Sequence, residues 1–320
     1  MLVSVVVPTF RRPDLLQRCL AALHRQQFPQ CEFEVVVADD AADEATRQLI
    51  ESRQSPFFSA CYIPVNGHHG PAAARNAGWR AARGQFIAFT DDDCIPDSGW
   101  LSAGLQPFAD PTVVAVTGQT IVPLPRFPTD HDLNTAGLER SEFLTANCFC
   151  RRAVLADLGG FDEQFTSAWR EDSDLHFRLL DTGGKVVRQC AAVVVHPVRQ
   201  AAWGNCIHEQ RKSLFDALLF RKHPRRFRQR IRPRCPWNYY LVVMAAFTTI
   251  FAAALGASVA SAVAGTIWLL VTIQFCFRRL KNTTWSFPHL VEMLVTSPVI
   301  PFLSVYWRIC GAIRFRVLFW

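Results

Sequence analysis

The 320-residue sequence lacks the cysteine patterns that hold disulfide frameworks or zinc ions. Its 11 cysteines include no C-x-x-C pair and no zinc spacing, and Cys148 and Cys150 are too close for a usual zinc site. This pattern predicts reduced structural thiols in a cytosolic body. We also expect no signal peptide, because the apolar residues 2–7 follow no basic leader and stop at Pro8. They predict a first buried strand.

Acidic residues are almost missing from the last hundred positions. From Arg221 to Trp320 the chain has 14 Lys or Arg residues and a single acid, Glu292. The first 220 residues carry 20 basic and 26 acidic side chains. A mildly acidic body is therefore joined to a strongly basic tail, which suits either nucleic acid or an anionic membrane face.

Two apolar stretches favour the membrane. Residues 237–255 and 257–277 contain no charged side chain, and each is about as long as a bilayer core requires. Basic clusters at 221–234 and 278–281 flank them, which predicts a hairpin with both flanks in the cytoplasm. A soluble helical hairpin is the alternative. The basic, aromatic and proline-broken residues 286–320 predict interfacial helices rather than a third span.

Strand and helix patterns alternate over the first 200 residues. The expected strands cover residues 3–7, 33–38, 60–63, 86–90, 113–117, 120–122 and 185–195. The expected helices cover residues 12–25, 43–52, 70–83, 153–157, 171–181 and 203–220, and the Pro-rich residues 123–135 resemble a loop. The alternation predicts an α/β fold with a parallel sheet and helices on both faces.

Three consecutive carboxylates follow the strand expected at 86–90. Asp91, Asp92 and Asp93 would repel one another unless something cationic lay among them, and a divalent metal with an attached diphosphate meets this need. In an open α/β sheet, ligands bind outside the carboxyl ends of the strands. The triplet therefore predicts a site for a metal-bound nucleotide.

A series of motifs then occurs in the order that family 2 glycosyltransferases show. The motifs lie at residues 3–12, 34–40, 70–78, 90–93, 159–163 and 171–175. The sequence over residues 2–200 resembles that family. The resemblance implies the GT-A fold, which is Rossmann-like with a mostly parallel sheet and flanking helices. It also implies an inverting, metal-dependent transfer from a nucleotide-diphosphate sugar, with a UDP-sugar as the favoured donor and Mg²⁺ or Mn²⁺ as cofactor.

The resemblance assigns nucleotide-binding roles near the first two strands. Pro8, Thr9 and Arg11 follow the first strand and would face the nucleotide. Asp40 would hydrogen-bond the base, with capping of the next helix as its alternative role. Asp39 could do either.

Further roles follow at the acidic triplet. Asp91 and Asp93 would be the D-x-D carboxylates, one reaching the ribose or the metal and the other coordinating the metal at the diphosphate; Asp92 is placed with the nucleotide-binding residues. The metal would stabilise the departing nucleoside diphosphate. Arg75 would pair with the acids or the phosphates, or form a structural salt bridge. His196 would be a third metal ligand or a packed histidine.

The catalytic role falls on the helix expected at 171–181. The resemblance implies that Asp172, rather than Glu171 or Asp174, is the general base that takes the proton of the acceptor hydroxyl. Carboxylates in a first helical turn are also favoured by the helix dipole, which is the structural alternative.

The expected organisation follows. Residues 1–220 would be the catalytic domain, 221–236 a basic linker, 237–277 a transmembrane hairpin and 278–320 interfacial helices. The Q-x-x-R-W motif of processive members is missing from the residues after the base, which favours transfer of a single sugar.

The expected acceptor is a lipid-linked or other membrane-proximal glycan, as in cell-envelope polysaccharide synthesis. The expected place is a bacterial inner membrane, with the catalytic domain on the cytoplasmic face and no nucleic-acid partner. The alternatives are a protein or soluble acceptor, and a catalytically silent membrane scaffold.

Overall fold

The computed structural model describes residues 2–52 and 60–319. Trp320, the last residue of the predicted interfacial region, lies outside the described residues. The chain divides into two compact units, and each is described by itself. The first unit contains Met1–Pro123 and Ala136–Val198, and the second contains Leu124–Thr135 and Arg199–Trp320.

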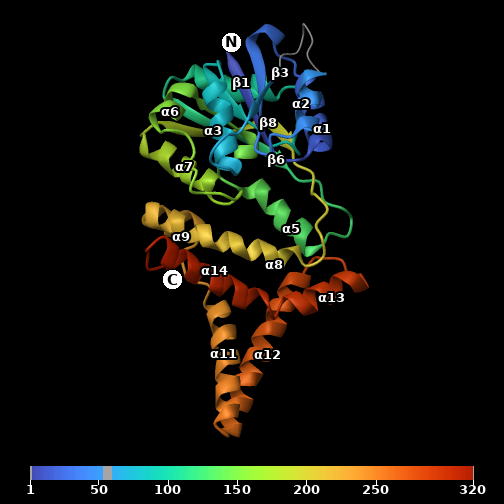
Figure 1. Ribbon diagram of the computed structural model, residues 1–320, viewed down its shortest axis with the longest axis vertical. Coiled ribbons are helices and arrows are strands. Elements are labelled where there is room, and N and C mark those ends of the chain that lie inside the picture. The colour runs from blue at the N-terminus through green and yellow to red at the C-terminus, as the bar shows by residue number, and fades with distance from the viewer. Residues whose placement is uncertain (1, 53–59, 320) are drawn as a thin grey trace. The chain divides into compact units, whose positions relative to one another are not determined.

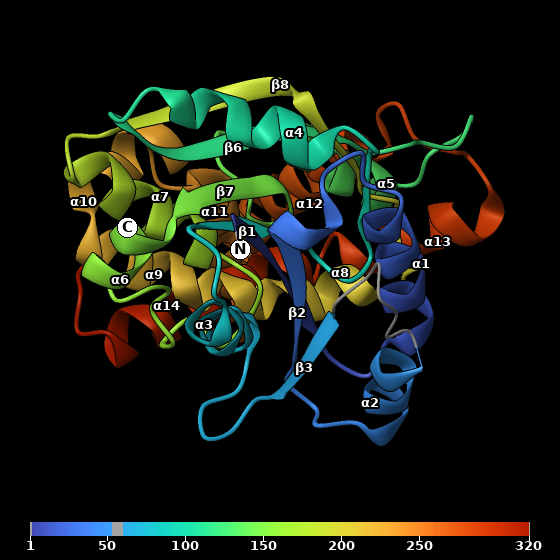
Figure 2. The same cartoon turned by 90° about the horizontal axis from the view of Figure 1, so that it is seen from above.

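An eight-stranded sheet forms the centre of the first unit. Its strands are β1 (Val3–Thr9), β2 (Phe33–Asp39), β3 (Ala60–Pro64), β4 (Phe86–Phe89), β5 (Ile95–Pro96), β6 (Val113–Ile121), β7 (Cys148–Arg151) and β8 (Lys185–Val195). Their order is β3-β2-β1-β4-β7-β6-β8-β5, and most of it can be followed in Figure 2. The first four strands in this order are parallel, as are β6 and β8. The strand β7 runs antiparallel to both β4 and β6, and β5 is antiparallel to β8.

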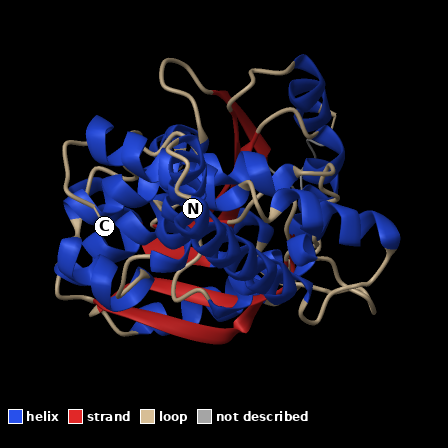
Figure 3. Ribbon diagram, turned by 90° about the horizontal axis from the view of Figure 1, so that it is seen from below, coloured by secondary structure: helices blue, strands red, loops and turns tan. Residues whose placement is uncertain are grey.

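Helices cover both faces of this sheet. They are α1 (Pro13–His24), α2 (Glu44–Glu51), α3 (Pro71–Ala81), α4 (Trp100–Leu105), α6 (Arg152–Asp157) and α7 (Glu171–Asp181). Short 3-10 turns lie at Gln30–Glu32, Gln106–Ala109, Gly137–Arg140 and Thr145–Asn147. Figure 3 draws the strands in red and the helices in blue.

Alternation along the strands separates the two core layers. Val5, with its neighbour Val35 on β2, packs in a core cluster with residues of α1, α2 and α4. Val6, with Val36, packs in a second cluster with residues of α3, α6 and α7. Strands buried on both faces are typical of a parallel sheet, and they explain the near-continuous apolar sequence of β1 and β2. The α/β fold predicted from the sequence is confirmed.

The strand predictions differ from the structure in three places. Residues 113–121 form one strand, β6, rather than two, because a register shift against β8 between Gly118 and Gln119 lets the chain continue through an irregular stretch. The short strands β5 and β7 were not predicted at all. They have two and four residues, too few for a clear period-two pattern.

The second unit is helical. Its elements are α5 (Asp130–Ala136), α8 (Asn205–Glu209), a 3-10 turn at Gln210–Lys212, α9 (Ser213–Lys222), α10 (Pro224–Arg226), a π-helical turn at Phe227–Ile231, α11 (Trp237–Ala254), α12 (Ser258–Leu280), α13 (Phe287–Thr296) and α14 (Ile300–Arg314), of which α5 reaches one residue into the first unit. The helix expected at 203–220 is therefore broken by the 3-10 turn. The ion pair of Lys212 with Glu209, three residues apart, suits the three-residue period of that turn.

The loop expected at 123–135 contains the start of α5. Thr129 and Asp132 form a capping box: the backbone N–H and hydroxyl of Thr129 donate to the Asp132 carboxylate, at 2.7 and 2.8 Å, and the Asp132 N–H donates to the Thr129 hydroxyl at 3.2 Å. The Thr-x-x-Asp pattern indicates the start of this helix. The prolines before it led to the prediction of a loop instead.

Helices α11 and α12 run side by side as a hairpin (Figure 1). Both are long and apolar enough to cross a bilayer, and α13 with α14, bent by 48°, would supply a third span if taken together. Large apolar side chains on the hairpin are exposed, among them Ile250 and Val259. Such a surface needs an apolar environment, which the bilayer would supply.

A buried arginine joins the base of the hairpin to two other segments of the second unit. Arg279, near the end of α12, donates to the carboxylate of Asp130 on α5 through Nε (3.2 Å) and Nη2 (2.8 Å). Its Nη1 donates to the hydroxyls of Thr296 (2.7 Å) and Ser297 (3.2 Å), at the bend between α13 and α14. The backbone N–H of Thr284 also donates to the carbonyl of Pro128 at 2.7 Å. The segment 124–135 is thereby fixed to the C-terminal helices.

Candidate active site

The carboxyl ends of three parallel strands meet at one edge of the first unit's sheet. The strands β1, β2 and β4 are neighbours and end at Thr9, Asp39 and Phe89, with the acidic triplet directly after β4. This is the edge where an open α/β sheet binds ligands. Because these strands are neighbours, Asp40 and the acidic triplet lie at the same edge of the sheet, as the sequence predicted.

Asp40 is held by the start of α3 rather than by the start of α2. Its carboxylate accepts the backbone N–H of Gly70 at 2.9 Å and lies 3.0 Å from Nδ1 of His69. Gly70 has φ of +114°, and an added Cβ would meet the carbonyl oxygen of Thr166 at 2.9 Å, so only glycine suits this position. Asp43 supplies the N-cap of α2.

Asp39 has three hydrogen-bond partners within the first unit. It is fully buried, and its carboxylate accepts the backbone N–H groups of Ala41 and Asp43 and the hydroxyl of Tyr62. It thereby fixes the turn after β2. Burial and the carboxylate of Asp39 raise the pKa of Tyr62 to about 12, which keeps this phenol protonated as a donor.

Asp92 points into the protein and joins the ends of β1 and β4. It accepts the Thr9 hydroxyl at 2.8 Å and lies 3.5 Å from Nη1 of Arg12. Burial raises the pKa of Asp92 to about 6, opposed by the Thr9 hydrogen bond. Arg11, which was predicted to face the nucleotide, is exposed with φ of +52° and lies over the Phe10 ring. The nucleotide-binding roles of Pro8, Thr9, Arg11 and Asp92 stay predictions.

Arg75 links the acidic triplet to the helix that carries the predicted base. Its Nη2 donates to Asp91 at 2.7 Å and its Nη1 to Glu171 at 3.1 Å, and only 3% of the Arg75 side chain is exposed. Burial lowers the pKa of Arg75, but the charges of Asp91 and Glu171 outweigh burial and hold it above its usual value. Arg75 thus pairs with the acids Asp91 and Glu171, and its predicted contact with the phosphates stays a prediction.

Glu171 and Asp172 open α7 with different surroundings. Burial raises the pKa of Glu171 to about 7, opposed by the charge of Arg75 and reinforced by that of Asp172. Asp172 is half-buried, and its carboxylate accepts the backbone N–H of Ser173 at 2.6 Å. Burial also raises the pKa of Asp172, opposed by the Ser173 hydrogen bond and by Arg170. A raised pKa makes a carboxylate a better proton acceptor.

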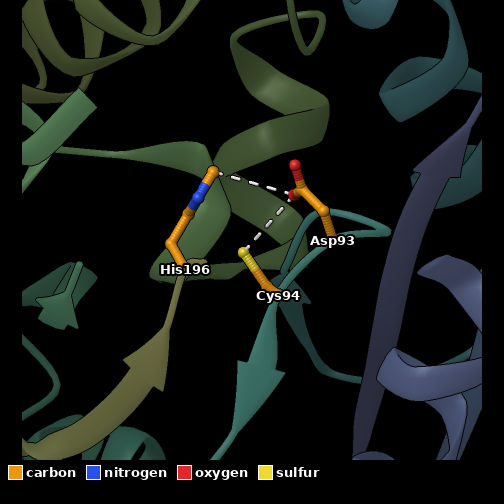
Figure 4. Close-up of side chains that lie close together, drawn as sticks. All are labelled: Asp93, Cys94 and His196. Atoms are coloured by element: carbon orange, nitrogen blue, oxygen red, sulfur yellow. Dashed lines mark hydrogen bonds and ion pairs between the residues drawn. The ribbon is translucent and has the colours of Figure 1, made fainter. Parts of the chain in front are cut away.

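Asp93 and His196 come together from β4 and β8. The Asp93 Oδ1 lies 3.7 Å from the His196 Nε2, and both side chains are buried. Cys94 joins them, with its Sγ 3.9 Å from the same oxygen (Figure 4). The carboxylate and the imidazole offer one oxygen and one nitrogen to a common point, so these residues fit a divalent metal. Asp91, whose carboxylate is bound to Arg75, is not in this group.

Sequence reasoning missed three members of this arrangement. Glu171 was considered only as a substitute for Asp172, Arg12 as one residue of a motif, and Cys94 as a structural thiol. An Arg on α3 with the Glu-Asp pair gives no signal by spacing, because the chain brings them together from positions 96 residues apart.

The sheet, its flanking helices and the acidic edge are arranged as in the GT-A fold. Residues 4–157 match the family described as Glycosyl transferase family 2. The chain is 26% identical over 208 residues to the glycosyltransferase AglE of Haloferax volcanii, and 32% identical over 216 residues to the pre-mycofactocin glycosyltransferase of Mycobacterium tuberculosis. Each match covers 62% of this chain, and they cover 67% and 43% of those relatives. Residues 4–157, just under half of the chain, are therefore similar to the family 2 glycosyltransferases.

Solved structures support the fold. The mannosyltransferase PcManGT from Pyrobaculum calidifontis, solved with GDP-Man and Mn²⁺, resembles 96% of this chain and 86% of its own with a TM-score of 0.61 and 21% identity. Staphylococcus aureus TarS 1–349, solved with UDP-GlcNAc, gives a TM-score of 0.52 at 17% identity, covering 100% of this chain and 93% of its own. The predicted fold class is confirmed.

Proposed function

We propose that the protein transfers one sugar from a nucleotide-diphosphate sugar to a hydroxyl of a lipid-linked or membrane-proximal acceptor, with inversion at the anomeric carbon. The observation that carries the proposal is the link from Asp91 through Arg75 to Glu171, next to Asp172. It ties the acidic edge of the sheet, where a donor diphosphate would lie, to the helix of the candidate base.

Asp172 is the proposed general base. Its carboxylate takes the proton of the acceptor hydroxyl while that oxygen attacks the anomeric carbon from the face opposite the diphosphate. Burial raises its pKa, which favours proton acceptance, and the Ser173 N–H holds one oxygen in place. Arg75 holds Asp91 and Glu171, the residue before Asp172, without itself taking part in the proton transfer.

Asp40, Asp93 and His196 are proposed for donor binding. Asp40, fixed by the Gly70 N–H, would accept a hydrogen bond from the base. Asp93 and His196 would hold the Mg²⁺ or Mn²⁺ ion, which when bound supplies Lewis-acid stabilisation of the departing nucleoside diphosphate. We expect the donor to be a UDP-sugar, with a GDP-sugar as the second choice. Proteins of this fold have been solved with UDP-GlcNAc and with GDP-Man and Mn²⁺.

The acceptor proposal rests on the second unit. Its hairpin has exposed apolar surface, and residues 221–234 carry eight basic residues and no acid. Each Lys or Arg near an anionic leaflet contributes roughly 1 kcal/mol. A relative in Campylobacter jejuni, 34% identical over 104 residues that cover 32% of this chain and 33% of that protein, is named a GalNAc(5)-diNAcBac-PP-undecaprenol beta-1,3-glucosyltransferase. We propose the same class of acceptor at the cytoplasmic face of a bacterial inner membrane.

A donor screen with the purified full-length protein tests the proposal. UDP-, GDP- and dTDP-sugars are incubated with Mn²⁺ and an undecaprenyl-diphosphate glycan, and release of nucleoside diphosphate is scored beside the Asp172→Asn variant. We expect release from one nucleotide class, dependent on acceptor and lost in the variant. Donor binding without turnover would favour a silent scaffold, and equal turnover on a water-soluble acceptor would overturn the acceptor proposal.

A further inference from the structure

Large apolar side chains of the second unit are exposed outside the hairpin as well as on it. Phe127 is 67% exposed, Trp285 is 66% exposed and Phe287 is 79% exposed. Leu124 is exposed too. They come from two segments that lie far apart in the sequence, and the role proposed for the hairpin does not account for the earlier one.

Two contacts hold the earlier segment at the end of α12. The backbone N–H of Thr284 donates to the carbonyl oxygen of Pro128 at 2.7 Å, so Phe127 and Trp285 flank one hydrogen bond. The ion pair of Arg279 with α5 is the second contact. Figure 2 shows the green segment that leads into α5 beside the orange segment that leads into α13. The exposed side chains of both segments therefore belong to one end of the hairpin.

The length of α12 sets the depth of this end in a bilayer. The 23 residues of Ser258–Leu280 make a helix about 34 Å long, slightly more than the roughly 30 Å thickness of the hydrocarbon core. The basic residues at 278–281 follow the apolar stretch, and such clusters lie at the level of the headgroups. A hairpin that spans the bilayer therefore brings Thr284 and its partner Pro128 to the headgroup layer.

The charges around the exposed side chains match an anionic surface. Residues 124–129 and 281–288 contain Arg126 and Lys281 and no acid. The two acids in the first turn of α5 are bound in the ion pair and the capping box described above. The guanidinium of Arg126 lies 5.3 Å from the centre of the Phe127 ring. A ring beside a cation suits the membrane interface, because the ring lies at headgroup level while the cation contacts lipid phosphates.

The backbone of the earlier segment is restricted before it meets any partner. Prolines occupy positions 123, 125 and 128, and each fixes one backbone dihedral. A restricted segment loses little conformational entropy on binding, so more of the gain from apolar contact is kept.

We propose that residues 124–127 insert into the headgroup layer of an anionic membrane, beside Trp285 and Phe287. The segment that follows β6 is then a lipid-contacting element, in addition to the hairpin and the C-terminal helices. The lipid contact rests on the proposed function only in placing the hairpin in a membrane. Neither donor nor acceptor is needed to test it.

Photo-cross-linking in a membrane tests the proposal. The photoreactive amino acid p-benzoylphenylalanine replaces Phe127 in the full-length protein, which is reconstituted into nanodiscs of phosphatidylglycerol and phosphatidylcholine, and irradiated samples are analysed for lipid adducts by mass spectrometry. The same replacement at Phe251, an exposed residue of the hairpin, is the positive control. Phe10 is the matched negative control, because it is an exposed phenylalanine of the first unit with the guanidinium of Arg11 5.4 Å from its ring.

We expect lipid adducts at positions 127 and 251 and none at position 10. In nanodiscs of phosphatidylcholine alone, the yield at position 127 should fall at least about threefold, because the basic side chains no longer gain from anionic headgroups. The yield at position 251, in the apolar hairpin, should stay the same. Leu124 serves as a second probe position if the replacement at Phe127 prevents folding.

Labelling of position 251 without lipid adducts at position 127 would overturn the proposal, because the segment would then face water. Equal labelling at positions 127 and 10, an unchanged yield at 127 in phosphatidylcholine, or adducts at 127 with protein instead of lipid would also overturn it. Lipid adducts at position 127 without sugar transfer would support the lipid contact and remove the proposed function. Sugar transfer with no lipid adduct at position 127 would do the reverse. Absence of lipid adducts at position 251 would remove the membrane hairpin and, with it, this proposal.

Discussion

Buried arginines occur in both units, and Arg75 in the first has different partners from Arg279 in the second. Arg75 in the first unit binds two carboxylates, Asp91 and Glu171. Arg279 in the second unit binds one carboxylate, Asp130, and two hydroxyls. Their side chains are 3% and 8% exposed. The first cluster therefore carries one more negative charge than its arginine can neutralise, whereas the second is balanced.

This difference distinguishes a candidate ligand-binding cluster, around Arg75, from a cluster that holds segments of the chain together, around Arg279. Spare negative charge in a buried cluster is costly unless a ligand or a proton supplies the balance. Burial raises the pKa of Glu171 to about 7, and the charge of Asp172 adds to the rise. A balanced cluster needs nothing further and serves to hold segments together. The comparison makes the first cluster sensitive to protons and ligands and the second sensitive only to the loss of its members.

The largest expected effect is on catalysis. Asp172→Asn removes the proposed base while keeping the size of the side chain. Transfer should fall by roughly 10²–10⁴-fold, with little change in nucleotide affinity, because the base acts on the acceptor. Turnover by nucleoside-diphosphate release and affinity by calorimetry check this, with Asp181→Asn at the far end of α7 as control. Unchanged turnover would remove Asp172 from its role.

The next effect is on stability. Arg75→Met leaves Asp91 and Glu171 without their buried cation, and we expect a cost of about 3–5 kcal/mol. Arg279→Met should cost less, about 1–3 kcal/mol, because it strands a single carboxylate. Thermal unfolding of both variants in the same detergent measures the difference. Equal shifts would mean that the charge imbalance of the first cluster has no energetic consequence.

A pH dependence follows from Glu171. Its pKa is raised from 4.5 to about 7 on folding, so the folded state binds more protons than the unfolded state in this window. Stability from this group is therefore fully present below about pH 4.5 and is lost as the pH rises toward 7. Glu171→Gln should weaken the dependence of the melting temperature on pH over that range, whereas Glu51→Gln, at an exposed position, should leave it unchanged. A wild-type profile that rises over the same range would contradict the assignment.

The smallest expected effect concerns the ion pair between Asp130 and Arg279. Asp130→Asn and Arg279→Gln, made singly and together, form a double-mutant cycle with an expected coupling of about 0.5–3 kcal/mol. Thermal unfolding of the four proteins in one detergent gives the coupling. A value near zero would show that the two groups, although 2.8 Å apart, contribute independently.

The sequence predicted the parts of the fold that depend on local pattern. The apolar runs of β1, β2 and β4, the helical spacing of α1 and the two spans all have strong periodicity or length, and each lies close to its predicted bounds. The order of these elements then fixed the edge at which Asp40 and the triplet lie, because parallel strands end together. The domain boundaries and the individual site roles remain predictions.

The remaining features depend on contacts between distant segments. Arg75 and Glu171 meet only after α3 and α7 pack on the same face of the sheet. The partners of Asp91 and Asp92 differ because adjacent residues after a strand point in different directions, and sequence cannot say which turns inward. The capping box at Thr129 could be recognised from the sequence. The contact of α5 with Arg279 could not, because the two lie 149 residues apart.

The attachment of residues 124–135 to the C-terminal helices limits where the protein can be shortened. A protein shortened to residues 1–220 would keep Asp130 but lose Arg279, and the carbonyl of Pro128 would lose the N–H of Thr284. Such a fragment would thus contain one carboxylate, that of Asp130, without its arginine partner. Low stability or solubility of such a fragment would then reflect the loss of these two interactions rather than a defect in its sheet.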